Sequence, residues 1–171
     1  MRIERLDPSV QDRTQFASGI PAVDNFFART ANKLQRANNL RVFVLLADNG
    51  DILGFYALNA FAMDYRDLPD SFARARANHG TIPAAFVAMM GIDARHQGKR
   101  LGKHILSDAC ARAVRAAEHL GLAAIALDVL DCGDEERVRR RHRFYTSFGF
   151  IPLPVNPMRM YMPISAVELE G

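Results

Sequence analysis

The chain has 171 residues, of which 49% are hydrophobic and 24% are charged. That length predicts a single domain, 1–171, that folds without disulfide staples, and the charged fraction excludes wholesale disorder. The formal net charge of +3 is too small to identify a nucleic-acid-binding protein. Two cysteines cannot build a disulfide scaffold or a four-thiolate zinc site. The start lacks the apolar core of a secretory signal and no apolar run is long enough to cross a membrane, so we expect a cytoplasmic protein without membrane contact.

Strand and helix patterns alternate along the chain. Pro21 precedes apolar residues at helical spacing and predicts a helix over 21–36. Asn49-Gly50 lies between two apolar runs and predicts a hairpin. In chain order, we expect strands at 2–6, 40–47, 52–63, 84–92, 122–130 and within 149–164, and helices at 21–36, 69–78, 101–119 and 134–147. This alternation is typical of an α/β or α+β fold with a mixed sheet.

The glycine-containing turn at 93–102 is the most informative segment. It follows the apolar run 84–92, which predicts a strand buried on both faces, and Gly91 there indicates a bulge or a close backbone approach. It precedes a helix, whose first N–H groups are unpaired and carry partial positive charge. Four cations add full charges: Arg95, Lys99, Arg100 and Lys103. The sequence therefore predicts an anion site, most naturally for a pyrophosphate.

Known motifs narrow this interpretation. A P-loop needs four residues between its glycine and the Gly-Lys pair, then Ser or Thr. Here three residues separate Gly98 from Gly102, His104 follows Lys103, and a dinucleotide-binding G-x-G-x-x-G is absent. Gln97-Gly-Lys-Arg-Leu-Gly102 resembles the Q-x-x-G-x-G/A coenzyme A loop of the GNAT N-acetyltransferase superfamily, with Arg100 in place of the first glycine. A basic surface loop that caps an ordinary helix is the alternative.

A later segment resembles the same family. Arg141-His-Arg-Phe-Tyr145-Thr-Ser-Phe-Gly-Phe150 is similar to its A-x-x-F-Y-x-x-x-G-F pattern, with Arg141 replacing the alanine. The resemblance implies that Tyr145 is the general acid that protonates the departing thiolate, which is chemically reasonable for a phenol with a pKa of about 10. An aromatic side chain that is half-buried on a helix is the alternative interpretation of Tyr145.

The family resemblance also implies a fold and a co-substrate. The fold would be a central mixed, mostly antiparallel sheet of six to seven strands flanked by about four helices. The co-substrate would be acetyl-CoA, with the pantetheine arm at residues 90–92 and the pyrophosphate at 97–103. The residues expected to bind it are Met90, Gly91, Ile92, Gln97, Gly98, Lys99, Arg100, Leu101, Gly102 and Lys103.

The N-terminal half narrows the resemblance to one branch. Phe16-x-x-Gly19-x-x-x-Val23-Asp24 is similar to the Phe-x-x-Gly-x-x-x-Leu-Asp opening of GNAT toxins from toxin–antitoxin pairs. Leu53–Leu58, Leu68-Pro69 and Ile82-Pro83 also fall where that branch has matching residues. The branch implies acetylation of the α-amine of aminoacyl-tRNA, which blocks translation, and a ribbon-helix-helix antitoxin as partner. With the apolar edge strands it also favours a homodimer.

The acceptor is less well marked than the coenzyme. Arg29, Lys33 and Arg36 lie at helical spacing on the first helix, and Arg139 and Arg140 lie in the stretch 131–143, where toxins usually have a short link. These residues fit tRNA phosphates or simply hydrated helix faces. A small-molecule or protein amine acetyltransferase and an inactive GNAT-fold binding module are the alternatives. No residue is identified as the general base, and without His-Glu-x-x-His or similar spacing we expect no metal.

Overall fold

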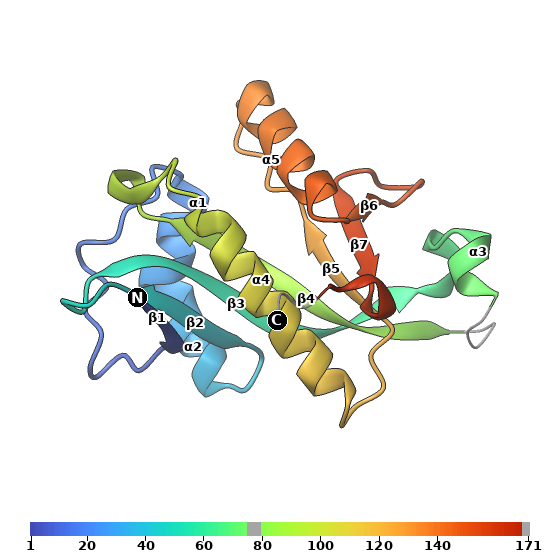
Figure 1. The fold of residues 1–171 in the computed structure, drawn as a ribbon, viewed down its shortest axis with the longest axis horizontal. Coiled ribbons are helices and arrows are strands. Elements are labelled where there is room, and N and C mark those ends of the chain that lie inside the picture. The colour runs from blue at the N-terminus through green and yellow to red at the C-terminus, as the bar shows by residue number, and fades with distance from the viewer. Residues whose placement is uncertain (75–79, 169–171) are drawn as a thin grey trace. The chain divides into compact units, whose positions relative to one another are not determined.

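The computed structural model describes residues 1–74 and 80–168, and Figure 1 shows its helices and strands. The strands are β1 (Arg2–Arg5), β2 (Arg41–Leu46), β3 (Ile52–Asp64), β4 (Thr81–Ile92), β5 (Ala124–Asp128), β6 (Ile151–Pro152) and β7 (Arg159–Pro163). The helices are α1 (Pro21–Asn25), α2 (Ala31–Arg36), α3 (Asp70–Ala73), α4 (Leu101–Ala117) and α5 (Glu135–Ser147). The strands form one seven-stranded sheet in the order β1-β2-β3-β4-β5-β7-β6. The predicted fold class is therefore confirmed.

The N-terminal hairpin follows the expected turn chemistry. Ala47 donates its N–H to Asp51 O at 2.9 Å, and Gly50 has a φ of 91°, which glycine adopts at no steric cost. This turn sets the antiparallel register of β2 and β3, in which Val44 lies opposite Phe55. β1 then adds to the free edge of β2, also antiparallel.

The helix predicted over 21–36 contains a π turn, Phe26–Thr30, between α1 and α2. Its buried residues are spaced by four: Val23, Phe27, Ala31 and Gln35. Four α-helical residues advance about 40° past a full turn, so this spacing would drift around a regular helix. The wider π turn offsets the drift and keeps all four on the core side. Buried Gln35 then links the residue after β1 to strand β2, since its amide donates to Leu6 O and accepts from Val42 N, both at 2.9 Å.

The chain forms two compact units, Met1–Asn59 with Val87–Ala109, and Ala60–Phe86 with Cys110–Gly171. An aromatic cluster forms much of the first unit's core: Phe27 stacks on Phe55 with ring centroids 4.1 Å apart, and Phe16 meets Phe27 edge-on at 4.9 Å. The second unit has a core that includes Met63, Ile82, Ala124, Leu153 and Tyr161. The expectation that 1–171 is a single domain stays a prediction.

Two expectations about elements need correction. The first is that strand 84–92 is buried on both faces; this is wrong for its second half, because residues 88–92 are partly exposed although most are apolar. The second concerns 149–164, where a single strand was expected. The segment contains the two-residue β6 before β7, and the two pair antiparallel. Of the helix predicted at 69–78, α3 covers Asp70–Ala73, and residues 75–78 lie outside the described part of the chain.

Candidate functional site

The predicted anion-binding turn has a backbone that alternates in handedness. Gly98 has a φ of 78° and Arg100 a φ of 60°. The family motif has glycine at the position of residue 100, and the backbone of that residue is in the left-handed region, which favours glycine. Arg100 adopts the same conformation, at a steric cost of about 1 kcal/mol. The departure from the motif therefore changes a side chain and leaves the backbone shape intact.

The turn leads directly into α4, where backbone donors are free. Lys103 N and His104 N both donate to Arg100 O, at 3.0 and 3.4 Å. In the hydrogen bonds of the described residues, Leu101 N and Gly102 N have no acceptor. Successive unpaired N–H groups beside a left-handed residue form a concave anion site, and the helix dipole adds partial positive charge. Lys99, Arg100 and Lys103 are exposed around it.

The same turn is held against the segment that precedes α1. Ala94 N donates to Ala17 O at 2.8 Å, the Gln97 amide donates to Ser18 O at 2.9 Å, and the Arg95 guanidinium donates to Gln15 O at 3.2 Å. The Gln97 side chain also donates to Ile92 O at 3.0 Å. Gln97 is thus engaged in positioning the turn, and its side-chain amide N–H groups point at the protein.

Asp93 is the buried carboxylate beneath this turn, with 1% of its surface exposed. It accepts two hydrogen bonds from the Arg95 side chain, at 2.8 and 2.9 Å, and one from Arg95 N at 3.0 Å. These bonds lower the pKa of Asp93 to about 2. Asp93 therefore remains ionised at neutral pH and caps the short 3-10 helix Ala94–His96, which is a structural role.

Gly91 lies where the end of β4 meets the aromatic core. A Cβ at Gly91 would lie 2.6 Å from Val23 Cγ1 and 3.3 Å from the Phe55 ring. A Cβ at Gly54, on β3, would lie 2.6 Å from the end of the Ile92 side chain and 3.0 Å from Gly91 O. The close backbone approach expected at Gly91 is confirmed, and the bulge stays a prediction. Partial exposure of Met90, Gly91 and Ile92 leaves them accessible to a ligand.

Tyr145 lies on α5 in the second unit and is 7% exposed. Burial raises the pKa of Tyr145 to about 12, with a smaller opposing effect of the Arg141 charge. The phenol is therefore fully protonated at neutral pH, as a proton donor must be. Phe150 packs edge-on against its ring, with centroids 6.1 Å apart.

Arg141, which replaces the alanine of the family pattern, anchors the loop before α5. Its guanidinium donates to Leu130 O at 3.0 Å and to Cys132 Sγ at 3.1 Å. This hydrogen bond lowers the pKa of the Cys132 thiol. The second departure from the motif thus also has a structural explanation.

The arginines of α5 are largely neutralised by acids in its first turn. Arg139 pairs with Glu135 at 3.4 Å and with Glu136 at 3.0 Å, and Arg143 also reaches Glu136, at 3.1 Å. Arg140 is exposed and has no ion pair among the described residues. On the first helical segment Arg29, Lys33 and Arg36 are all exposed. The predicted acceptor-binding cations are thus accessible, but Arg139 is already paired.

Sequence reasoning missed the residues that hold the turn in place. Asp24 accepts from both Ser18 N and Ser18 Oγ at 2.7 Å, and Gly19 has a φ of 78°. These bonds explain the Phe-x-x-Gly-x-x-x-Val-Asp pattern: it shapes the segment on which the turn rests. The pattern itself was the available signal, but only as a resemblance.

The fold and the turn at 93–102 are together typical of a class of proteins that bind acyl-coenzyme A. The model of the acetyltransferase (GNAT) domain family matches residues 38–152, and the chain belongs to that family. It is 48% identical to a probable toxin TacT of Sinorhizobium fredii, over 97% of this chain and 92% of the relative. It is 34% identical to a tRNA-acetylating toxin of Mycobacterium tuberculosis, over 88% of this chain and 85% of the relative.

A solved structure shares the fold. AtaT, in complex with acetyl-methionyl-tRNAfMet, superposes with a TM-score of 0.85 at 24% identity, covering 98% of this chain and 97% of AtaT. In the described part of the chain no cluster of three metal-ligating side chains occurs. Within the same residues no helix has the length and apolar character needed to span a bilayer.

Proposed function

We propose that the chain is an acetyl-CoA-dependent N-acetyltransferase that acetylates the α-amine of aminoacyl-tRNA and so blocks translation. The observation that carries the coenzyme part is the left-handed turn at Gly98 and Arg100, followed by free N–H groups at the start of α4. The aminoacyl-tRNA part rests on similarity to a relative named as a tRNA-acetylating toxin.

Each group has a defined task in this mechanism. The N–H groups of Leu101 and Gly102, with the surrounding cations, bind the pyrophosphate of the coenzyme. Backbone groups of residues 90–92 hold the pantetheine arm and polarise the thioester carbonyl. Tyr145 donates its proton to the thiolate as the acetyl group leaves. The α-amine of an aminoacyl ester has a pKa below about 8, so water can take its proton.

Partners and organisation follow from the same proposal. A toxin of this kind would act in the cytoplasm, where charged tRNA is found, and would be held inactive by a ribbon-helix-helix antitoxin. We further propose a homodimer and a single catalytic domain over 1–171. Of the alternatives, the inactive binding module is the least supported, because Arg100 keeps the backbone conformation that the motif glycine would provide.

The test removes one hydroxyl group, that of Tyr145. Tyr145→Phe should lower kcat for acetyl transfer from radiolabelled acetyl-CoA to bulk aminoacyl-tRNA by about 100-fold or more, with the Kd for acetyl-CoA unchanged. Expression of the unaltered protein should arrest growth, and expression of the variant should not. Tyr161→Phe is the matched control, since Tyr161 is also a buried tyrosine of the second unit, 3% exposed. Acetylation of small amines without acetylation of aminoacyl-tRNA would refute the proposed substrate.

A further inference from the structure

A basic hollow lies on the first unit between the segment after β1 and the helix α2. It has a volume of about 420 Å³ and is lined by three arginines, Arg5, Arg13 and Arg36, together with Asp7 and Asn32. We call it the arginine hollow. Pro8 is its one apolar lining residue, so it is not an apolar groove of the kind that anchors a protein partner. Arg36 therefore belongs with Arg5 and Arg13, whereas Arg29 and Lys33 do not line the hollow.

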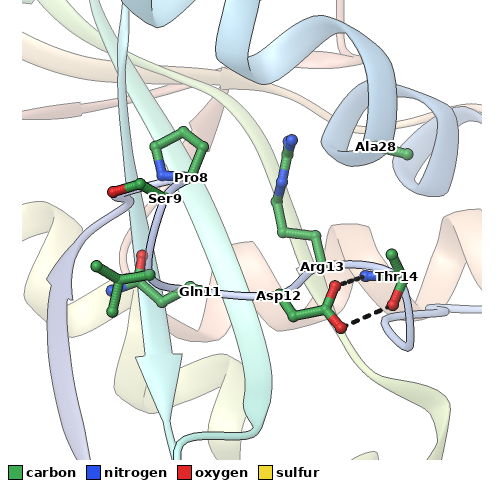
Figure 2. Close-up of a pocket in the computed structure, with 8 residues that line it drawn as sticks. Pro8, Ser9, Gln11, Asp12, Arg13, Thr14 and Ala28 are labelled. Atoms are coloured by element: carbon green, nitrogen blue, oxygen red, sulfur yellow. Dashed lines mark hydrogen bonds between the residues drawn. The ribbon is translucent and has the colours of Figure 1, made fainter.

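Arg13 is the deepest of the three cations. Figure 2 shows its side chain extending from the 8–14 loop, beside the helical segment that carries Ala28. Its guanidinium donates to Phe27 O in the π turn and lies 5.6 Å from the centroid of the Phe27 ring. A guanidinium has five N–H donors, and this contact uses one of them. Partial burial lowers the pKa of Arg13, and no carboxylate among the described residues pairs with it.

In the described chain, the acids near the hollow form no ion pair with its three arginines, although the Asp7 carboxylate lines the hollow and keeps its negative charge. Asp12 accepts from Thr14 N and Thr14 Oγ1, at 2.8 and 2.9 Å, on the far side of the loop from the Arg13 guanidinium (Figure 2). Asp7 accepts from Ser9 N and Ser9 Oγ, at 2.9 and 2.6 Å. Glu4 is bound by Arg2 and Gln11, at 3.0 and 2.6 Å.

The other two arginines of the hollow, Arg5 and Arg36, are free to pair with an anion. Arg5 and Arg36 are exposed, and neither has an ion pair within residues 1–74 and 80–168. A partly desolvated cation without a carboxylate is costly unless an anion joins it. The hollow thus offers an excess of positive charge and several unmet planar donors, which match the oxygens of a phosphate group.

We infer that the arginine hollow binds backbone phosphates of the acceptor RNA, as a second anion site separate from the coenzyme turn. This inference rests on the proposed function, because it assigns part of the surface that holds aminoacyl-tRNA. Contacts with phosphates position a nucleic acid without reading its sequence. The hollow would therefore contribute to affinity for all tRNAs alike and leave the choice of amino acid to other residues.

The test measures binding of bulk deacylated bacterial tRNA by fluorescence anisotropy over a range of KCl concentrations. The variant is Arg5→Gln/Arg36→Gln; Arg13 stays unchanged because it also holds Phe27 O. Loss of two phosphate contacts should reduce the slope of log K against log[KCl] by about 1.5 and weaken binding on the order of 30-fold at 100 mM KCl. The apparent KM for aminoacyl-tRNA should rise, with kcat and the Kd for acetyl-CoA unchanged.

The control variant is Arg74→Gln/Arg115→Gln, which removes two other exposed arginines and should leave the slope unchanged. An equal slope for Arg5→Gln/Arg36→Gln and the unaltered protein would overturn the inference, even where the unaltered protein acetylates aminoacyl-tRNA. Weaker binding of an acidic antitoxin peptide with unchanged tRNA binding would also overturn it, in favour of a protein partner. Failure of the unaltered protein to acetylate aminoacyl-tRNA would instead contradict the proposed function.

Discussion

Arg100 is a non-glycine residue at a φ of 60°, one of two in the described chain. The left-handed region is open to glycine and costly for side chains, most of all for β-branched ones. The position is exposed, so packing adds little to this preference. Backbone conformation is therefore the property of residue 100 that the turn at 93–102 requires, and the guanidinium is an addition to it.

This conclusion predicts opposite effects of two substitutions. Arg100→Gly should leave the free energy of unfolding unchanged or raise it by about 0.5 kcal/mol, because relief of strain exceeds the entropy that glycine adds to the unfolded chain. Arg100→Val should lower it by about 1–2 kcal/mol. Urea unfolding followed by circular dichroism measures both. Equal stability of the glycine and valine variants would contradict a left-handed residue 100.

The Tyr145 hydroxyl makes a prediction about pH. A general acid acts in its protonated form, which is lost as pH rises through its pKa. With a pKa of about 12 for Tyr145, kcat should show no fall from loss of this proton between pH 8 and roughly 10.5, where an ordinary tyrosine of pKa about 10 would already ionise. Initial rates corrected for thioester hydrolysis provide the check. A decline near pH 10 that Tyr145→Phe abolishes would mean that the phenol is not buried during turnover.

At the scale of elements, the contact of α1 with β4 depends on a missing side chain. Gly91→Ala would place a Cβ 2.6 Å from Val23 Cγ1, and such overpacking should cost about 1–3 kcal/mol. Val23→Ala removes the clashing methyl, so Gly91→Ala should cost at least about 1 kcal/mol less in that background. Chemical denaturation of the four proteins in this cycle measures the coupling. Gly121→Ala is the control, since its Cβ would meet nothing within 4 Å; additive effects at residues 23 and 91 would refute the contact.

The elements also show which features a sequence can predict. Pro21, Asn49-Gly50 and the apolar run before Gly91 each carry a local pattern, and the helix, hairpin and strand were predicted from them. The π turn was not, because the apolar residues of 21–36 fit a regular helix equally well. β6 was not, because two residues beside prolines carry no alternation. The site divides in the same way: Gly102 and Tyr145 belong to motifs, whereas the structural roles of Gln97 and Arg141 depend on contacts with residues outside those motifs, Ser18 and Leu130.

At the scale of the whole molecule, the excess charge is not spread evenly. On α5 the arginines face glutamates one turn away, so much of that charge is compensated locally. Among the described residues, Lys99 and Arg100 of the turn at 93–102 have no ion pair, nor do Arg5 and Arg36 of the arginine hollow. A net charge of +3 is thus compatible with two anion-binding surfaces. Acidic and basic side chains nearly balance over the rest of the chain, so the total charge stays small.

Coenzyme binding should stabilise the folded chain. A ligand that binds only the native state, at 100 times its Kd, adds about 2.7 kcal/mol, which for a chain of this size raises Tm by roughly 5–10 °C. Acetyl-CoA should produce this shift in differential scanning fluorimetry. Gly102→Glu should abolish it, because a carboxylate beside the N–H groups of α4 repels the pyrophosphate. Gly121→Glu is the control and should keep the shift; a shift retained by Gly102→Glu would place the pyrophosphate elsewhere.

The π turn also gives the first helical segment a tolerance in chain length. Removal of one residue between 26 and 30 would let α1 and α2 join as a regular helix, and because the wider turn had offset about one residue of rotation, α2 would keep nearly the same face toward the core. Gln35 would then keep its bonds to Leu6 and Val42. Homologous chains should therefore accommodate a one-residue deletion within 26–30, whereas a deletion between 31 and 34 would rotate every later residue of α2 by about 100°.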